Sequence, residues 1–107
     1  MTEEIFQELV QSELEHIGEL FKSKNDQYKT NDDPLANFTS GAMLRYKSAA
    51  LPAQYETLKD YVAKHVAHIY NNDLNGQKVS ESLQDIVVYF VIARVMSKLH
   101  NQDEVQR

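Results

Sequence analysis

The sequence contains no cysteine, only three glycines and two prolines, and no long run of apolar residues. Without cysteine there is no disulfide framework, no thiol nucleophile and no cysteine-ligated zinc site. Three glycines do not supply a glycine-rich phosphate-binding loop. No stretch approaches the roughly 18 apolar residues that a membrane span requires, and the N-terminus opens with Thr2, Glu3 and Glu4 instead of a secretory signal. We therefore expect a cytoplasmic protein with no membrane segment.

Chain length and net charge further limit the binding partners and the domain organisation that we expect. The formal net charge is -5, and lysine and arginine are scattered along the chain. Non-specific binding of nucleic acid needs a basic face, so we do not expect it. The net charge does not exclude binding of a protein partner or of a nucleotide that is bound to a divalent cation. The 107 residues are 42% hydrophobic, which suits one core, and we expect a single helical domain over 1–107, with an ordered core over about 3–100 and a polar tail over 101–107.

Apolar residues recur every three to four positions in three long segments, which predicts three long helices. The segments are residues 3–28, residues 54–70, and residues 80–100 with Ser80 as the cap. Between the first two segments, Asp33-Pro34 predicts a short helix over 35–38, and another is expected over 42–50, stopping near Pro52. The predicted fold class is all-α, a compact bundle of three longer helices plus one or two short helices.

The last predicted helix contains an ambiguous segment. Residues 86–93 form an unbroken apolar run rich in β-branched residues, which also suits a buried strand. We favour a helix because the apolar spacing continues to Leu99 and no partner strand is predicted. Two apolar stripes follow from helical spacing, one with Leu83, Ile86, Phe90 and Ala93 and one with Val88, Ile92, Val95 and Leu99. A helix that is apolar on two sides is typical of a central bundle position or of a homodimer contact.

Two charged residues of the first predicted helix fall on its apolar face. At about 100° per residue, Glu13 and Lys24 lie among Phe6, Ile17 and Phe21. A charge on a core-facing stripe is costly unless it is paired, hydrogen-bonded or bound to a metal. The alternative is that both residues lie at the rim of the bundle, where a lysine can extend to water.

The last predicted helix carries a pair of acids near its start. Glu81 and Asp85 are one turn apart and extend the second apolar stripe. Two carboxylates on one face repel each other, and a divalent cation such as Mg²⁺ turns that repulsion into attraction. The alternative is that both acids merely suit the positive end of the helix dipole.

The third candidate site is a group of basic residues in the middle predicted helix. His65 shares the face of Leu58 and Val62, and Lys64 and His68 lie beside it. A lone histidine on an apolar face is more often a hydrogen-bonded core residue than a ligand. The spacing of His65 and His68 is a weak metal signal without the His-Glu-x-x-His motif.

Four segments together resemble a known family: Lys24-Asn25-Asp26-Gln27-Tyr28, Asp33-Pro34-Leu35-Ala36-Asn37-Phe38, Lys64-His65 and Glu81-Ser82-Leu83-Gln84-Asp85. The series resembles small phage and prophage proteins of the nucleotide-modification-associated (formerly unknown-function) family, over about residues 20–93. A looser similarity reaches the MazG-like all-α nucleoside triphosphate pyrophosphohydrolases, which hold Mg²⁺ against a triphosphate with paired acidic motifs.

The resemblance implies a phage-type, Mg²⁺-dependent nucleotide-binding protein in a bacterial host cytoplasm. If active, such a protein hydrolyses the α–β phosphate bond of a nucleoside triphosphate. Glu81 and Asp85 are then the catalytic acids and hold the metal, with Glu13 as a third ligand. The residues implied on the nucleotide side are Lys24, Tyr28, Asn37, Phe38, Lys64 and His65.

The rival hypothesis is a non-catalytic interaction protein that binds and modulates a host or phage protein. Ser82 stands where the pyrophosphohydrolase pattern often has a second glutamate. Hydrolysis with two metals needs about three or four convergent carboxylates, and the sequence places only two. The partner is therefore a nucleotide or a protein, and the two-sided last helix favours a homodimer.

Overall fold

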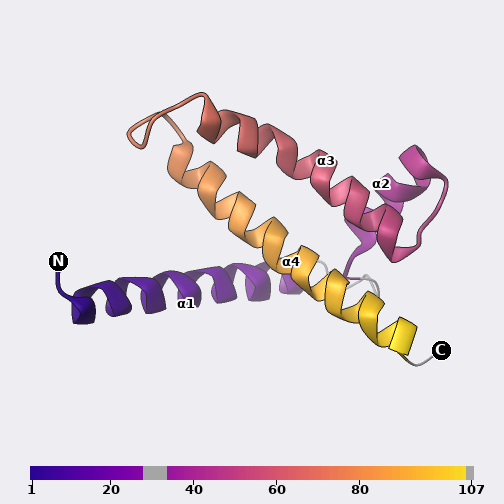
Figure 1. The fold of residues 1–107 in the computed structure, drawn as a ribbon, viewed down its shortest axis with the longest axis horizontal. Coiled ribbons are helices and arrows are strands. Elements are labelled where there is room, and N and C mark those ends of the chain that lie inside the picture. The colour runs from indigo at the N-terminus through magenta and orange to yellow at the C-terminus, as the bar shows by residue number, and fades with distance from the viewer. Residues whose placement is uncertain (28–33, 106–107) are drawn as a thin grey trace. The chain divides into compact units, whose positions relative to one another are not determined.

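The computed structural model describes residues 1–27 and 34–105, with side chains over 1–23 and 34–102. The helices are α1 (Glu3–Gln27), α2 (Ala36–Tyr46), α3 (Leu51–Tyr70) and α4 (Val79–Val105) (Figure 1). The predicted all-α class is confirmed. The chain divides into two compact units, Met1–Pro34 and Leu35–Arg107, which are described separately. The single domain over 1–107 stays a prediction. None of the described helices has the length and apolar character needed to cross a membrane.

The first unit consists of α1 with its N-terminal cap. The Ile5 N–H donates to Thr2 Oγ1 at 3.2 Å, so Thr2 satisfies an amide that the first turn leaves without an intrahelical acceptor. Glu3 and Glu4 occupy the first turn, where a negative charge suits the positive end of the helix dipole. These features explain why the helix begins where the sequence predicts.

Residues 36–46 form one helix where the sequence predicts two short ones. The predicted break includes Gly41, which lies inside α2 and is buried. A Cβ atom at this position would lie 2.7 Å from Thr57 Cγ2 and would also meet the Tyr61 hydroxyl, both on α3. A glycine inside a helix costs about 1 kcal/mol relative to alanine, and the close packing on α3 offsets that cost. The prediction of one or two short helices beside three longer ones is confirmed, whereas the break placed at Gly41 is wrong because this glycine is a packing position.

α3 begins at Leu51, earlier than the predicted start at Gln54, and Pro52 lies in its first turn. Proline is tolerated there because its missing N–H would have no intrahelical partner. Gln54 is buried at this end of α3, and its side-chain amide donates to the carbonyl of Ala49 at 2.8 Å. The expectation of a helix over 42–50 is correct for 42–46, which belong to α2, and wrong for 47–50, which connect α2 to α3.

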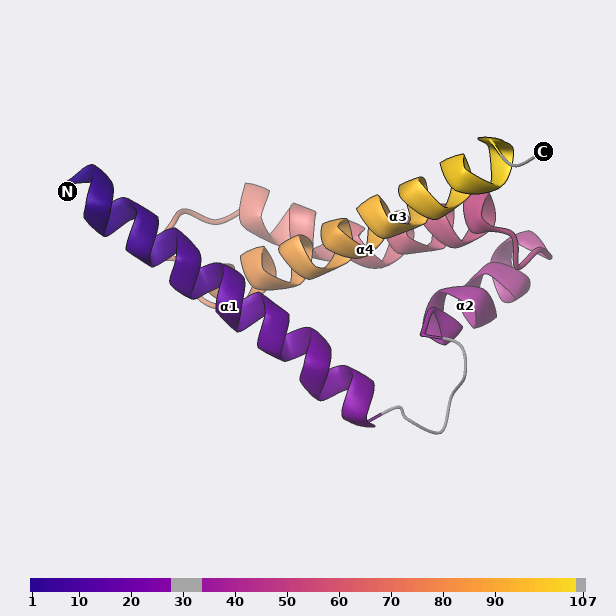
Figure 2. The same ribbon diagram turned by 90° about the horizontal axis from the view of Figure 1, so that it is seen from below.

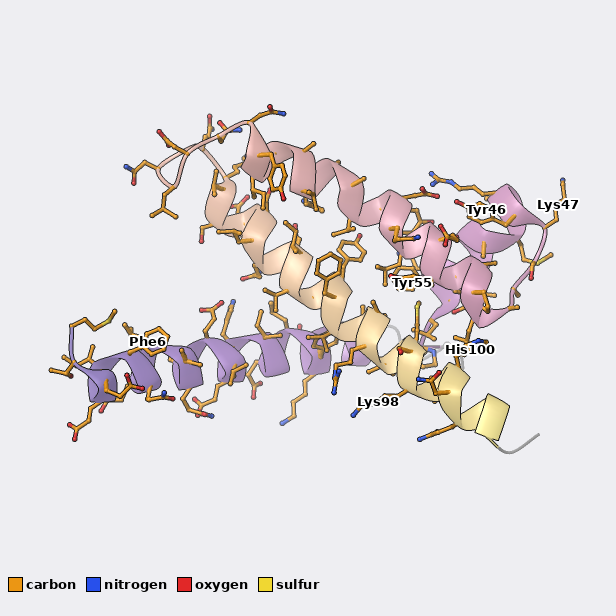
Figure 3. The ribbon with its side chains drawn as sticks, in the orientation of Figure 1. Phe6, Tyr46, Lys47, Tyr55, Lys98 and His100 are labelled. Carbon is orange, nitrogen blue, oxygen red and sulfur yellow. The ribbon has the colours of Figure 1, made fainter. Side chains whose placement is uncertain are left out.

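A polar cluster centred on Asp60 also joins α2 to α3. The Tyr46 hydroxyl donates to Asp60 Oδ2 at 2.6 Å, and Arg45 Nη1 lies 2.9 Å from the same oxygen. The hydrogen bond from Tyr46, followed by the contact with Arg45, lowers the pKa of Asp60. The same hydrogen bond raises the pKa of Tyr46. Figure 3 shows Tyr46 on α2 near the start of α3.

The core of residues 35–105 lies where α2, α3 and α4 meet. α3 and α4 run antiparallel and side by side, and α2 lies against the N-terminal half of α3 (Figure 2). Phe38, Leu58 and Met96 supply one buried side chain from each helix. The Phe38 ring centroid lies 5.8 Å from that of Tyr61 and 6.2 Å from that of Tyr89. Around this centre pack Leu35, Leu51, Tyr61, Tyr89, Ile92 and Ala93.

α4 contains the ambiguous run 86–93, so the preference for a helix over a strand is confirmed. The helix begins at Val79 and continues to Val105, beyond the predicted end near residue 100. Gln102 and Glu104 have favourable helix propensity, which explains why the polar tail continues the helix.

Candidate functional site

The face of α4 that packs on α3 includes residues that the sequence analysis did not select. Ser82, Tyr89 and Met96 recur every seven residues, which is close to two helical turns. Ser82 and Met96 are buried, and Tyr89 packs against the core. Of the second predicted stripe, Val88 is buried and Ile92 packs against the core, whereas Val95 and Leu99 are exposed. A search for aliphatic stripes passes over a serine and a tyrosine, but their seven-residue spacing is a signal that could have found this face.

Three of the predicted site residues come together around Tyr89. Asp85 Oδ2 lies 3.6 Å from His65 Nε2, and the His65 ring centroid lies 6.0 Å from that of Tyr89. Phe38 contacts the same tyrosine edge-on. Burial raises the pKa of Tyr89, and the charge of Asp85 and the nearby Tyr61 raise it further. The cluster brings an acid, a base and two aromatic rings into one neighbourhood of α2, α3 and α4.

The carboxylates expected to hold a metal are open to water. Glu81 and Glu13 are exposed, and the Asp85 side chain is 41% exposed with His65 beside it. The expectation that these acids face a core is therefore wrong, because solvated carboxylates carry no desolvation cost that a cation must offset. Over the part of the chain that the structure describes, no three His, Asp or Glu side chains are grouped as metal ligands. A metal site with Glu13, Glu81 and Asp85 stays a prediction.

The residues expected to contact a nucleotide differ from one another in their exposure to water. Asn37 and Lys64 are exposed, which leaves both side chains accessible to a ligand. Phe38 is 6% exposed, and its ring is used in the core. The side chain of Lys24 and the whole of Tyr28 lie outside the described residues.

His68 has a structural contact at the end of α3. Its Nε2 lies 2.8 Å from the carbonyl oxygen of Gln77 in the loop before α4. The Asn72 side chain donates to the His68 carbonyl at 2.9 Å. These hydrogen bonds tie the loop to α3.

The side of α4 opposite Tyr89 carries an exposed apolar surface, which we call the outer face of α4. Six of its apolar residues are each at least 40% exposed: Leu83, Val87, Phe90, Val91, Val95 and Leu99. Val88, which helical spacing places between Val95 and Leu99, is buried. Arg94 and Lys98 lie among them by helical spacing and are also exposed. Lys98 extends from α4 on the side away from α3 (Figure 3). Soluble proteins tolerate scattered apolar residues on the surface, whereas a contiguous patch of this kind is typical of an interaction site.

α1, taken by itself, is an acidic amphipathic helix. Five residues of its apolar stripe are each at least 37% exposed: Ile5, Phe6, Leu9, Val10 and Leu14. Ile17, on the same stripe, is 7% exposed. At about 100° per residue, Glu13 falls in the middle of this stripe. Residues 1–34 contain nine acidic residues and three lysines, whereas residues 35–107 contain seven acidic and eight basic residues. The negative charge of the chain is therefore concentrated in the unit that contains α1.

Comparison with known proteins gives no relative. No protein-family model, curated protein or solved structure matches the chain. The functional argument therefore depends on the surfaces of the chain itself.

Proposed function

We propose that this chain is a non-catalytic interaction protein, and that the outer face of α4 binds an amphipathic helix of another protein chain. The observation that carries the proposal is the exposed apolar patch, which lies opposite the face that α3 covers. The six apolar side chains span Leu83 to Leu99, a rise of about 24 Å along the helix axis. A stripe of this length suits the side-by-side packing of a second helix.

Site-specific photo-crosslinking of the full chain tests this proposal. A benzophenone amino acid in place of Phe90 is expected to form an adduct with one defined protein in the cell, identified by mass spectrometry. The matched control places the same photoreactive group at Leu74, which is 85% exposed in the loop between α3 and α4. That position is expected to give no adduct, and Val87→Asp is expected to remove the adduct formed at Phe90. An absence of protein adducts from probes at Val87, Phe90 and Val91 contradicts the proposal.

A second candidate is Mg²⁺-dependent binding of a nucleoside triphosphate, with hydrolysis of the α–β phosphate bond if the site is active. It is favoured by the position of Phe38, His65 and Asp85 around Tyr89. Glu81, one turn before Asp85, would complete the pair of acids.

A nucleotide screen separates the two candidates. Ribo- and deoxynucleoside triphosphates with Mg²⁺ or Mn²⁺ are tested for pyrophosphate release and for a shift in melting temperature. The interaction proposal expects neither. Pyrophosphate release that is lost in Glu81→Ala and retained in Glu56→Ala, a matched exposed glutamate on α3, would support the second candidate instead.

A further inference from the structure

The loop between α3 and α4 contains a chemically labile pair of residues, Asn75-Gly76. The chain has seven asparagines, and only Asn75 is followed by glycine. Asparagine is thermolabile because the backbone nitrogen of the next residue can attack its side-chain amide. Glycine has no Cβ, so the nitrogen of Gly76 can approach that amide without a steric barrier from its own side chain.

Packing explains why the chain has a glycine at position 76. A Cβ atom at Gly76 would lie 2.7 Å from Asn72 Cβ and 3.0 Å from Val79 Cγ2. Both neighbours are fixed close to the backbone, and the first distance is shorter than real Cβ contacts allow. A larger residue would therefore displace the loop, and the fold requires the labile pair.

Hydrogen bonds within the loop hold the reactive nitrogen in place. The Gly76 N–H donates to the Asp73 carbonyl at 2.9 Å, and the Asn75 N–H donates to Asp73 Oδ1 at 3.1 Å. The first bond closes a β-turn and the second closes an Asx-turn. Attack on the Asn75 side chain requires the Gly76 nitrogen to lose its proton, which breaks the bond to Asp73. The reaction is therefore expected to proceed from an open form of the loop.

Two contacts between α3 and the loop oppose that opening. His68 Nε2 is hydrogen-bonded at 2.8 Å to the carbonyl oxygen of Gln77, the residue after the labile pair. The Asn72 side chain donates to the His68 carbonyl at 2.9 Å. The reacting atoms and the atoms that restrain them all belong to residues 68–79, so the restraint is local to this segment.

We propose that Asn75 is a site of spontaneous deamidation, and that the hydrogen bond between His68 and Gln77 slows the reaction by holding the loop closed. The deprotonated Gly76 nitrogen attacks Asn75 Cγ. The new C–N bond replaces the bond to the side-chain nitrogen, which takes up a proton and leaves as ammonia. The product is a succinimide ring, and the step needs no oxidant or reductant.

Water then opens the succinimide ring at one of its two carbonyl carbons. Opening at Cγ gives aspartate at position 75. Opening at the backbone carbonyl gives isoaspartate, in which the main chain runs through Cγ and is longer by one carbon. Both products add a negative charge close to Asp73, and isoaspartate also lengthens the turn. The modification does not depend on the outer face of α4.

Incubation of the full chain at physiological temperature and mildly alkaline pH tests the site. Peptide mapping by mass spectrometry measures the exchange of the side-chain NH2 for OH, and synthetic aspartyl and isoaspartyl peptides identify the two products. Modification is expected to accumulate at Asn75 and not at Asn37 or Asn101, which precede Phe38 and Gln102. Asn75→Gln is expected to remove it, because glutamine would have to close a larger ring. A chain that stays unmodified at Asn75 even in guanidinium chloride overturns the proposal.

His68→Ala tests the control of the rate. Loss of one hydrogen bond to the loop is expected to accelerate deamidation about fivefold in the folded chain. His100→Ala, near the far end of α4 (Figure 3), is the matched control and is expected to react at the wild-type rate. Circular dichroism confirms that both variants keep their helix content, so that a faster reaction reports opening of the loop and not global unfolding.

The unfolded chain supplies a second measurement that does not depend on the folding of a variant. In guanidinium chloride the wild type and both variants are expected to react at one common rate, faster than the folded wild type, because the loop is open in each. Equal rates in the folded and unfolded wild type, or in folded wild type and folded His68→Ala, overturn the proposed control by the loop.

Discussion

At the residue scale, α2 approaches α3 closely at Gly41, where a methyl group would meet Thr57 Cγ2 at 2.7 Å. Thr57 is fully buried, so its side chain has little space to move aside. We expect Gly41→Ala to lower the free energy of unfolding by about 1–3 kcal/mol through overpacking, reduced by a gain in helix propensity of up to about 1 kcal/mol. Urea denaturation followed by circular dichroism measures the change.

Gly18 is the control for this prediction. In the described part of the chain, a Cβ atom at Gly18 meets no heavy atom within 4 Å outside its own helix. Gly18→Ala is therefore expected to raise the helix content of α1, because alanine is the better helix former. Gly41→Ala proteins that are more stable than the wild type would contradict the close approach of α2 to α3.

Asp60 makes a pH-dependent contribution to stability. Its pKa in the folded chain is lowered, first by the hydrogen bond from Tyr46 and then by Arg45. Stability from these contacts is therefore fully present above the unfolded value near 3.8 and is lost as the pH falls through the lower folded value. We expect Asp60→Asn to reduce stability at neutral pH and to flatten the fall in stability below about pH 4.

Urea midpoints at neutral pH and at two acidic values measure this difference. Glu81→Gln, at an exposed carboxylate, serves as the control and is expected to follow the wild-type profile. An Asp60→Asn profile parallel to that of the wild type would exclude the contribution of the cluster.

At the scale of the helices, local sequence predicted most elements, and tertiary contacts decided the rest. The spacing of apolar residues predicted α1, most of α3 and the helical state of residues 86–93. It could not predict that Gly41 continues α2, because the reason lies on α3, at Thr57 and Tyr61. It placed Ile92 and Ala93 in apolar stripes but missed Tyr89 and Met96 on the packed face of α4, because these two side chains fit the space beside α3 in a way that hydrophobicity alone does not express.

The packed face of α4 yields a prediction with a matched control. Met96 is 2% exposed in the core, whereas Met43 on α2 is 51% exposed. Met96→Ala is expected to lower the free energy of unfolding by about 2–5 kcal/mol, because it leaves a cavity among the three helices. Met43→Ala is expected to change it by less than about 0.5 kcal/mol. Chemical denaturation of both variants at equal, low protein concentration tests the assignment, and equal losses would contradict it.

At the scale of the whole molecule, the sequence showed which charged residues share a helix face with apolar residues, but not whether those charged residues are buried. Glu13 lies on an apolar stripe as predicted, but it is exposed and not buried. His65 and Asp85 were predicted in one site and are close together, whereas Phe38 from the same prediction supports the core. Helical spacing fixes which residues share a face. Which face a neighbouring helix covers depends on three-dimensional fit, and that choice determines whether an acid meets water, a histidine or a partner.

The outer face of α4 is expected to contribute to binding of a partner and not to the stability of the fold. Phe90 tests this difference. Phe90 is 51% exposed, so Phe90→Asp is expected to keep the fold of residues 35–105. In the proposed complex the partner helix covers the exposed half of its ring, which is worth about 1 kcal/mol. Phe90→Asp also brings a charge into the apolar contact, and each 1.4 kcal/mol is about tenfold in Kd, so a benzophenone probe at Val87 is expected to lose its protein adduct in this variant. Tyr70→Asp, at a residue that is 83% exposed, is the control and is expected to keep the adduct. If Phe90→Asp instead lost its helix content, this face would belong to the core and not to an interface.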